Sequence, residues 1–210
     1  MSNGPRSVAL QRCRRRSRRA SRRRFSSPPA RSVLHAGLED VIEALAGLRD
    51  IRPRPALVIA GDSDSDSGSY RDRLARRASE LGVSDRIVWT GSLSPPEMWW
   101  CYDACSAFVI TSRAEACPNI ALEAMSRGCL CVSVDHPPMP EFFGGAALYY
   151  RAGDVILLTR RLSSMLSGDP KSFSAVRAAA VRRAAEFDWE TTADRTVSEL
   201  RRALSQRAES

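Results

Sequence analysis

The apolar residues of this chain follow two patterns that alternate from Gly37 onward. The segment LEDVIEALAGLRD (38–50) spaces its apolar residues three and four positions apart, which predicts an amphipathic helix. The next apolar segment, ALVIAG (56–61), is a short continuous run ended by glycine, which is typical of a buried strand. The same reasoning predicts helices over 69–82, 92–105 and 117–128, strands over 86–91, 106–112, 129–135 and 146–150, and helices in the remainder. This alternation indicates a parallel α/β sheet with right-handed crossovers.

The third of these helices carries its own start signal. Ser94 is followed by two prolines and then by Glu97, which is the spacing of a capping box with proline in the first turn. We therefore expect the helix to begin directly after Ser94. Trp99 and Trp100 lie just inside it, and we expect Trp99 to be a core residue rather than a stacking platform.

The positive charge of the chain is concentrated at its N-terminus. Residues 1–38 contain eleven arginines and no acid, since the first carboxylate is that of Glu39. Of the 32 Lys and Arg residues, 21 therefore fall in residues 39–210, against all 24 acids, which leaves that part with a net charge of −3. The acidic body argues against a specific nucleic-acid-binding protein, although the arginine-rich tail could bind nucleic acid or anionic surfaces through charge alone.

Composition divides the chain in two. We expect residues 1–30 to be an Arg- and Ser-rich disordered tail, because they contain too little apolar surface to offset the entropy of ordering. Residues 31–210 would form one domain of ordinary size. An organelle transit peptide is a second interpretation of the acid-free tail, but no amphipathic pattern accompanies it.

Several classes of protein are disfavoured by the composition. No stretch approaches the ~20 apolar residues of a membrane span, and no apolar segment follows the basic start as in a secretory signal. The six cysteines form no CxxC pair and fit reduced core residues of a cytoplasmic protein. The two histidines have no ligand spacing, so we expect no metal site. Peripheral contact with a membrane stays open.

Candidate chemistry gathers between residues 111 and 126. Glu115 lies in the loop after a predicted strand, and Glu123 lies about one turn into the following helix. Pro118 and Asn119 stand at the helix start, where backbone N–H groups are free. In open α/β sheets ligands bind at the carboxyl ends of the strands, where a helix start favours phosphate and a carboxylate can accept hydrogen bonds from sugar hydroxyls. From the residues alone, the favoured interpretation is that Glu115 is a solvated loop acid and Glu123 a surface acid of the helix.

The surrounding segment, SRAEACPNIALEAMSRGCLCVSVD, resembles a family signature. It is similar to the E-x7-E motif of retaining glycosyltransferases with the GT-B fold, especially family four, which reads roughly S-x-x-E-G-x-P-N-x-x-L-E-A-M-A-x-G-x-P-V-V. PPMPEFFGGAALYY (137–150) and FDWETTADRTVSELRRAL (187–204) resemble the later parts of the same domain. The resemblance covers roughly 36–204 and implies the Rossmann-like parallel sheet of the C-terminal, nucleotide-sugar-binding domain of the GT-B fold.

The resemblance also assigns roles to individual residues. Glu123 would bind the ribose hydroxyls of a nucleotide sugar, and Glu115, the catalytic candidate, would hold a hydroxyl of the transferred sugar. The helix start around Pro118, Asn119 and Ile120 would face the sugar or diphosphate. The turn at Thr90 and Gly91 would meet the nucleobase. The donor is a substrate, so no separate cofactor is implied.

The N-terminal part of the chain departs from the family pattern. Members begin this domain with a strand of the form V-G-R-L, followed by a lysine and glycine that open the first helix; the arginine and lysine grip the leaving diphosphate. Here Ala36 stands where the lysine is expected, and SSPPARSV precedes it instead of a strand. The sequence therefore predicts a sheet that lacks its first, central strand.

Two functions follow from these observations. The first is a glycosyltransferase donor domain that transfers a hexosyl group to an unknown glycan, lipid or small molecule when an N-terminal acceptor domain completes it. The second is a truncated, catalytically inactive remnant that binds nucleotide sugar without turnover. The missing Arg and Lys favour the second for this chain on its own.

Overall fold

A computed structural model describes residues 7–10, 37–61 and 68–208 of the chain. Six parallel strands form one sheet in the order β3-β2-β1-β4-β5-β6. The strands are β1 (Ser7–Leu10), β2 (Ala56–Ala60), β3 (Ile87–Gly91), β4 (Cys105–Ile110), β5 (Cys131–Val134) and β6 (Ala147–Tyr150). This is the doubly wound order: β1 to β3 are added toward one edge of the sheet and β4 to β6 toward the other, so the switch point lies between β1 and β4. The expected Rossmann-like fold is confirmed.

The place of the first strand is a correction to the sequence analysis. β1 lies between β2 and β4 and pairs with both, Ser7 opposite Ala56 on one side and Val8 opposite Ala107 on the other. The central position that we expected to be empty is therefore filled by four residues from the segment assigned to a disordered tail. The other residues of that segment, like residues 62–67, lie outside the part of the chain that the structure describes.

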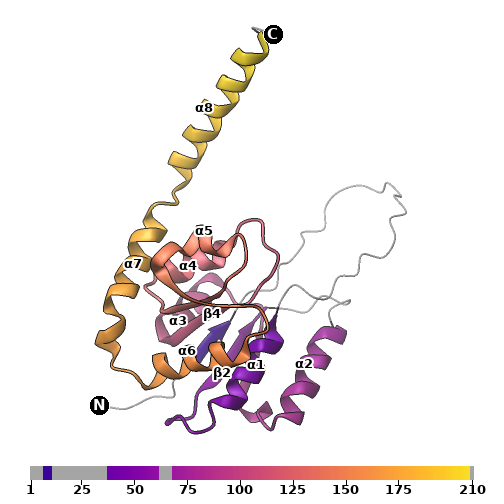
Figure 1. The fold of residues 1–210 in the computed structure, drawn as a ribbon. Coiled ribbons are helices and arrows are strands. Elements are labelled where there is room, and N and C mark those ends of the chain that lie inside the picture. The colour runs from indigo at the N-terminus through magenta and orange to yellow at the C-terminus, as the bar shows by residue number, and fades with distance from the viewer. Residues whose placement is uncertain (1–6, 11–36, 62–67, 209–210) are drawn as a thin grey trace.

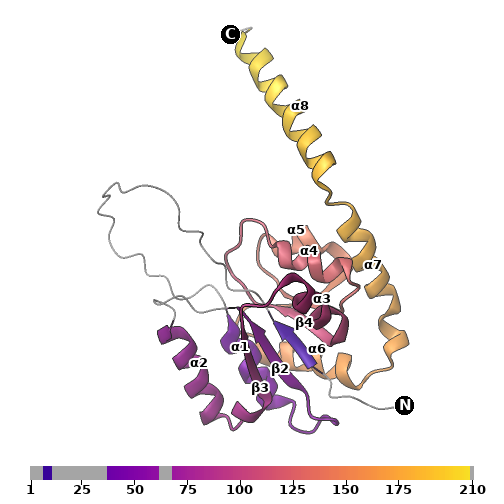
Figure 2. The same cartoon turned by 180° about the vertical axis from the view of Figure 1, so that it is seen from behind.

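Helices cover both faces of the sheet (Figures 1 and 2). Helices α1 and α6 pack together on one face, with α2 beside α1. On the other face α3 contacts β1 and β4, and α4 packs against α7. The helices are α1 (Leu38–Gly47), α2 (Gly68–Glu80), α3 (Pro95–Ala104), α4 (Asn119–Ser126), α5 (Met139–Phe143), α6 (Val155–Ser167), α7 (Ser174–Ala185) and α8 (Trp189–Ala208), with short 3₁₀ turns over Ser84–Arg86, Gly144–Ala146 and Pro170–Phe173.

The core follows from coverage on both faces. The last four residues of β4 and all four of β5 are buried, as expected for interior strands of a parallel sheet that read as continuous apolar runs. The predicted capping box at the start of α3 is present, with Ser94 and Glu97 bonded reciprocally. The prediction that Trp99 is a core residue is wrong. Trp99 is 51% exposed, and the residues of α3 that enter the core are Met98 and Tyr102.

The C-terminal helix α8 extends away from the sheet (Figure 1). Its described side chains are exposed apart from that of Thr191, which is partly buried. Four of the exposed ones are large and apolar: Trp189, Val197, Leu200 and Leu204. Within the described residues, neither this helix nor any other is long and apolar enough to cross a membrane.

Candidate functional site

The switch point between β1 and β4 brings the start of α1 against the loop that follows β4. Gly37 precedes α1 in the left-handed region at φ 63°, and a Cβ built there would lie 2.6 Å from the carbonyl oxygen of Thr111. Only glycine satisfies both the backbone angle and the close approach. The first turn of α1 is thereby fixed beside residues 111–118, the loop that carries Glu115.

Glu123 is held by a buried tyrosine from the neighbouring helix. Tyr102 is 2% exposed, and its hydroxyl donates a hydrogen bond to Oε2 of Glu123 over 2.9 Å. Tyr102 reaches it from α3, so the carboxylate is positioned by a contact between α3 and α4 rather than by its own helix. A carboxylate oriented in this way keeps further lone pairs with which to accept hydroxyl protons.

The loop from Thr111 to Pro118 places Glu115 next to the start of α4. Thr111 and Ser112 are buried, while Glu115 is partly buried. Pro118 is the buried N-cap of α4, and Asn119 is its exposed first residue. The backbone N–H of Asn119 donates to the carbonyl of Cys117 over 2.9 Å, so this N–H must change partner before it can face a ligand.

The turn at the end of β3 forms a second part of the site. Gly91 adopts φ 67°, and its carbonyl accepts a 2.8 Å hydrogen bond from the N–H of Gly61 at the end of β2. The Thr90 hydroxyl donates to the carbonyl of Ile59 over 3.3 Å. Two strands separate β3 from β4, which at ~4.8 Å per strand puts the turn about 14 Å from the Glu115 loop. Only an extended ligand can contact both.

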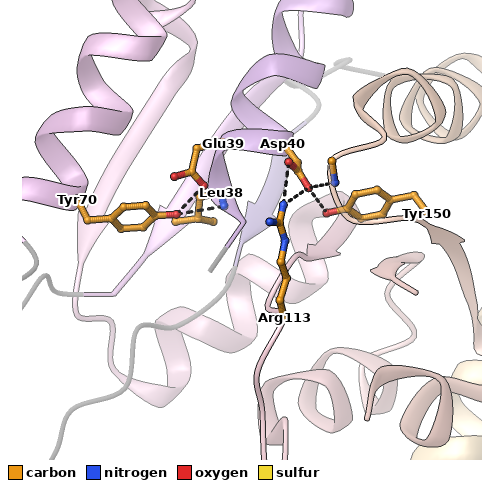
Figure 3. Close-up of polar contacts among 7 residues, drawn as sticks. Leu38, Glu39, Asp40, Tyr70, Arg113 and Tyr150 are labelled. Atoms are coloured by element: carbon orange, nitrogen blue, oxygen red, sulfur yellow. Dashed lines mark hydrogen bonds and ion pairs between the residues drawn. The ribbon is translucent and has the colours of Figure 1, made fainter. Parts of the chain in front are cut away.

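Two polar networks flank the start of α1 (Figure 3). In the first, the hydroxyl of Tyr70 from α2 accepts from the backbone N–H of Leu38 over 3.3 Å and donates to Glu39 over 2.9 Å. Burial, and then the charge of Glu39, raise the pKa of Tyr70 above its ordinary value. Tyr70 therefore stays protonated and caps the helix from outside it.

The second network joins three chain segments at Asp40, whose residue is 6% exposed. The Nη2 atom of Arg113 lies 3.3 and 3.2 Å from its two carboxylate oxygens. Oδ2 also accepts from the backbone N–H of Gly153 over 3.0 Å and from the hydroxyl of Tyr150 over 3.3 Å. Burial, followed by the charge of Asp40, raises the pKa of Tyr150.

Five of the sequence-predicted residues therefore share one loop and helix, and the other two lie across the sheet. The first group is Glu115, Pro118, Asn119, Ile120 and Glu123; the second is Thr90 and Gly91.

Sequence reasoning missed Asp40, Arg113, Tyr102 and Tyr150. Their contacts join residues 21 to 110 positions apart, a separation at which no local pattern gives a signal. No group of three or more His, Cys, Asp or Glu able to hold a metal occurs within the described ranges.

Comparison with known proteins decides the family. Residues 14–182 match the family model described as glycosyl transferases group 1, which is most of the chain. The chain belongs to the group 1 glycosyltransferases.

Its curated relatives within the group include D-inositol 3-phosphate glycosyltransferases. The chain is 28% identical to that of Mycolicibacterium paratuberculosis over 166 residues, which cover 78% of this chain and 37% of the relative. It is 30% identical to that of Rhodococcus opacus over 157 residues, covering 70% and 33% of the two chains. The chain thus spans about a third to two fifths of the length of these relatives.

Solved structures of glycosyltransferases share the fold. Sucrose-phosphate synthase from Thermosynechococcus elongatus superposes with a TM-score of 0.75 at 20% identity, over 96% of this chain and 46% of that one. Anabaena HepE in complex with UDP and glucose gives a TM-score of 0.73 at 19% identity, over 95% and 48%. The C-terminal domain of a group 1 glycosyltransferase, LpcC from Francisella tularensis, gives 0.67 at 17% identity, over 86% of this chain and 85% of that domain.

Proposed function

We propose that this chain binds a nucleoside diphosphate sugar along the carboxyl edge of its sheet, as the donor-binding part of a group 1 glycosyltransferase. Glu123 accepts hydrogen bonds from the ribose, Glu115 from the sugar, and the turn at Thr90 and Gly91 meets the base. The nucleotide is bound as a substrate, with no further cofactor. The observation that carries the proposal is the joint placement of Glu115 and Glu123 around the start of α4, at the switch point of the sheet.

The spacing of the two parts of the site supports an extended ligand. A nucleotide sugar has a base at one end and a hexose at the other, with charge between them. The edge offers a backbone turn at β3 for the planar base and two carboxylates at α4 for hydroxyl groups. The complexes of HepE with UDP and glucose, and with UDP-glucose, are consistent with this class of donor.

The chemistry of transfer would be mainly electrostatic. The departing diphosphate gains negative charge, and preorganised donors at the site stabilise it. No glycosidase-like pair of carboxylates is needed, so Glu115 and Glu123 act as hydrogen-bond acceptors for the donor. The acceptor, whether glycan, lipid or small molecule, lies outside what this chain specifies.

Titration of nucleotide sugars against the wild type and two Glu123 variants tests the proposal. Glu123→Ala should weaken donor binding by ~1.5–3 kcal/mol, the range for hydrogen bonds to a charged group. Glu123→Gln keeps an acceptor for Tyr102 and should fold normally while still losing affinity. Glu190→Ala, an exposed acid on α8, is the matched control. Unchanged affinity in both Glu123 variants would contradict the assignment.

A further inference from the structure

The loop that carries Glu115 is tied to the body of the domain by one of its own side chains. Arg113 lies two residues before Glu115, and its guanidinium crosses to Asp40 in the first turn of α1, 73 residues away in the sequence (Figure 3). One nitrogen, Nη2, contacts both carboxylate oxygens at 3.3 and 3.2 Å. This contact and the close approach of Gly37 to Thr111 together tie the loop to the first turn of α1.

The Asp40 carboxylate is itself held in place by hydrogen bonds from other parts of the domain. It also accepts hydrogen bonds from Gly153, in the turn before α6, and from Tyr150, at the end of β6. Tyr150 is 1% exposed and Asp40 is 6% exposed, so neither can swing into solvent. Arg113 thus binds to a carboxylate that α1, β6 and the turn after β6 already hold in place.

Stability is a weak explanation for this ion pair. Removing the Asp40 carboxylate from water costs several kcal/mol, and the ion pair offsets that cost only when its donors are satisfied; the Arg113 side chain, still 32% exposed, is partly screened by water. The Nε atom of Arg113 is buried and has no hydrogen-bond partner in the described part of the chain. An incompletely satisfied pair contributes little net free energy, but it does restrict the loop to one geometry.

We propose that Arg113 is a positioning residue for donor recognition: through Asp40 it holds the β4–α4 loop so that Glu115 meets the sugar. This inference rests on the proposed function, since it assumes that Glu115 contacts the donor's sugar. Arg113 itself need not touch the donor. Glu123 is held separately by Tyr102, so the nucleotide half of the site does not depend on Arg113.

This separation gives the proposal a specific signature. UDP contacts only the nucleotide part of the site, whereas UDP-glucose also presents a hexose to Glu115. Loss of the Arg113–Asp40 contact should weaken UDP-glucose binding about tenfold and leave UDP binding unchanged within about twofold. A residue that merely supports the fold would weaken both ligands together.

Three variants of the full chain test it by calorimetric titration with UDP and UDP-glucose. Arg113→Lys keeps the charge but loses the planar guanidinium, and should lose part of the preference for UDP-glucose. Arg113→Ala leaves the Asp40 charge buried and unpaired, so it is accompanied by the double variant Arg113→Met, Asp40→Asn, which leaves no buried charge. Arg127→Ala, which breaks an exposed ion pair to Asp103 at the far end of α4, is the control and should bind both ligands normally.

The Glu115→Ala background separates this proposal from the one on which it rests. If Arg113 acts through Glu115, removing Arg113 from the Glu115→Ala variant should change the UDP-glucose to UDP ratio no further. A further loss there would mean that Arg113 contacts the donor directly and would overturn the positioning role. A normal ratio in the folded double variant would also overturn it. An unaltered ratio in Glu115→Ala alone would instead overturn the proposed function.

Discussion

At the scale of single residues, the two carboxylates of the site are held by different means. Glu123 accepts a hydrogen bond from the uncharged hydroxyl of Tyr102, which leaves further lone pairs for a ligand. Glu115 lies on the loop that Arg113 ties to Asp40. A ligand that contacts both carboxylates therefore depends on two independent supports, one from α3 and one from α1.

The cysteines offer a residue-scale test of the site. Cys117 lies between Glu115 and Asn119 and is exposed, whereas Cys131 is buried in β5. Burial raises the pKa of the Cys131 thiol, and a hydrogen bond with Cys105 together with burial raises that of Cys129. Thiolates are the reactive species, so these two core thiols should resist alkylation in the folded protein.

We predict that iodoacetamide labels Cys117 at least tenfold faster than Cys131 at pH 8, and that a bound nucleotide sugar slows labelling of Cys117 alone. Peptide mass spectrometry over time measures each thiol separately. Partly buried Cys101 serves as the internal reference, because the ligand should not alter its rate. Equal rates at Cys117 and Cys131 would show that the core opens, and an unprotected Cys117 would place the donor elsewhere.

At the scale of elements, local patterns were sufficient for most of the fold. Apart from the short helix α5 (Met139–Phe143), for which no helix was predicted, the helices and strands from α1 to β6 lie within a few residues of the predicted ranges. Hydrophobic period and the glycines and prolines that end elements are properties of neighbouring residues, so they can be read locally. The start of α3 was predictable from Ser94 and Glu97 for the same reason. Trp99 was not, since α3 packs on the sheet mainly through Met98 and Tyr102.

Strand β1 could not be predicted from local sequence patterns. SVAL is four residues long and contains only two large apolar ones, and arginine-rich sequence surrounds it. No local feature distinguishes it from the rest of the basic segment. It forms because β2 and β4 both present open ladder positions, and unpaired backbone groups in the middle of a sheet are costly. The partners that specify it lie 49 to 99 residues further on, as with Leu10 opposite Ile59 and Val109.

We predict that Ala9→Pro lowers the free energy of unfolding by about 3 kcal/mol. Proline removes a backbone donor from a strand that is paired on both sides, which leaves a buried carbonyl unsatisfied. For a chain of this size, the thermal midpoint should fall by about 6–12 °C. Ala9→Ser keeps the N–H and is the control.

Deleting residues 1–10 should reproduce the loss seen with Ala9→Pro. A midpoint that stays constant in both variants would show that the sheet does not need β1, and would restore the original interpretation of the segment as a tail.

At the scale of the whole molecule, the chain has the fold of one domain of a larger glycosyltransferase. It superposes on 85% of an isolated C-terminal domain from the same group but on 46% of the sucrose-phosphate synthase chain. The family resemblance could be read from one loop and helix, whereas the network around Asp40 required the folded sheet. What the site does with a bound donor depends on the charge around the diphosphate.

That charge is unusual for the family. The resemblance places a lysine at the start of the first helix, but the sequence has Ala36, and the first turn of α1 carries Glu39 and Asp40 instead. The Asp40 carboxylate is paired with the cation of Arg113, whereas Glu39 accepts a hydrogen bond from the uncharged hydroxyl of Tyr70. A diphosphate that departs beside this turn gains less stabilisation than it would beside a lysine.

We therefore predict that this chain, purified as it stands, binds a nucleotide sugar but transfers it at a rate below detection. Losing one preorganised electrostatic contact to a departing group commonly costs ~10²–10³-fold in rate, and an acceptor that is not held beside the donor loses the advantage of proximity as well. The measurement is mass-detected transfer from a panel of nucleotide sugars to glycan and lipid acceptors, with donor hydrolysis counted separately.

Ala36→Lys should then strengthen donor binding before any transfer is detected, because it supplies charge but no acceptor. Transfer by the wild type that disappears in Glu115→Ala would refute the prediction and would mean that another cation stabilises the diphosphate.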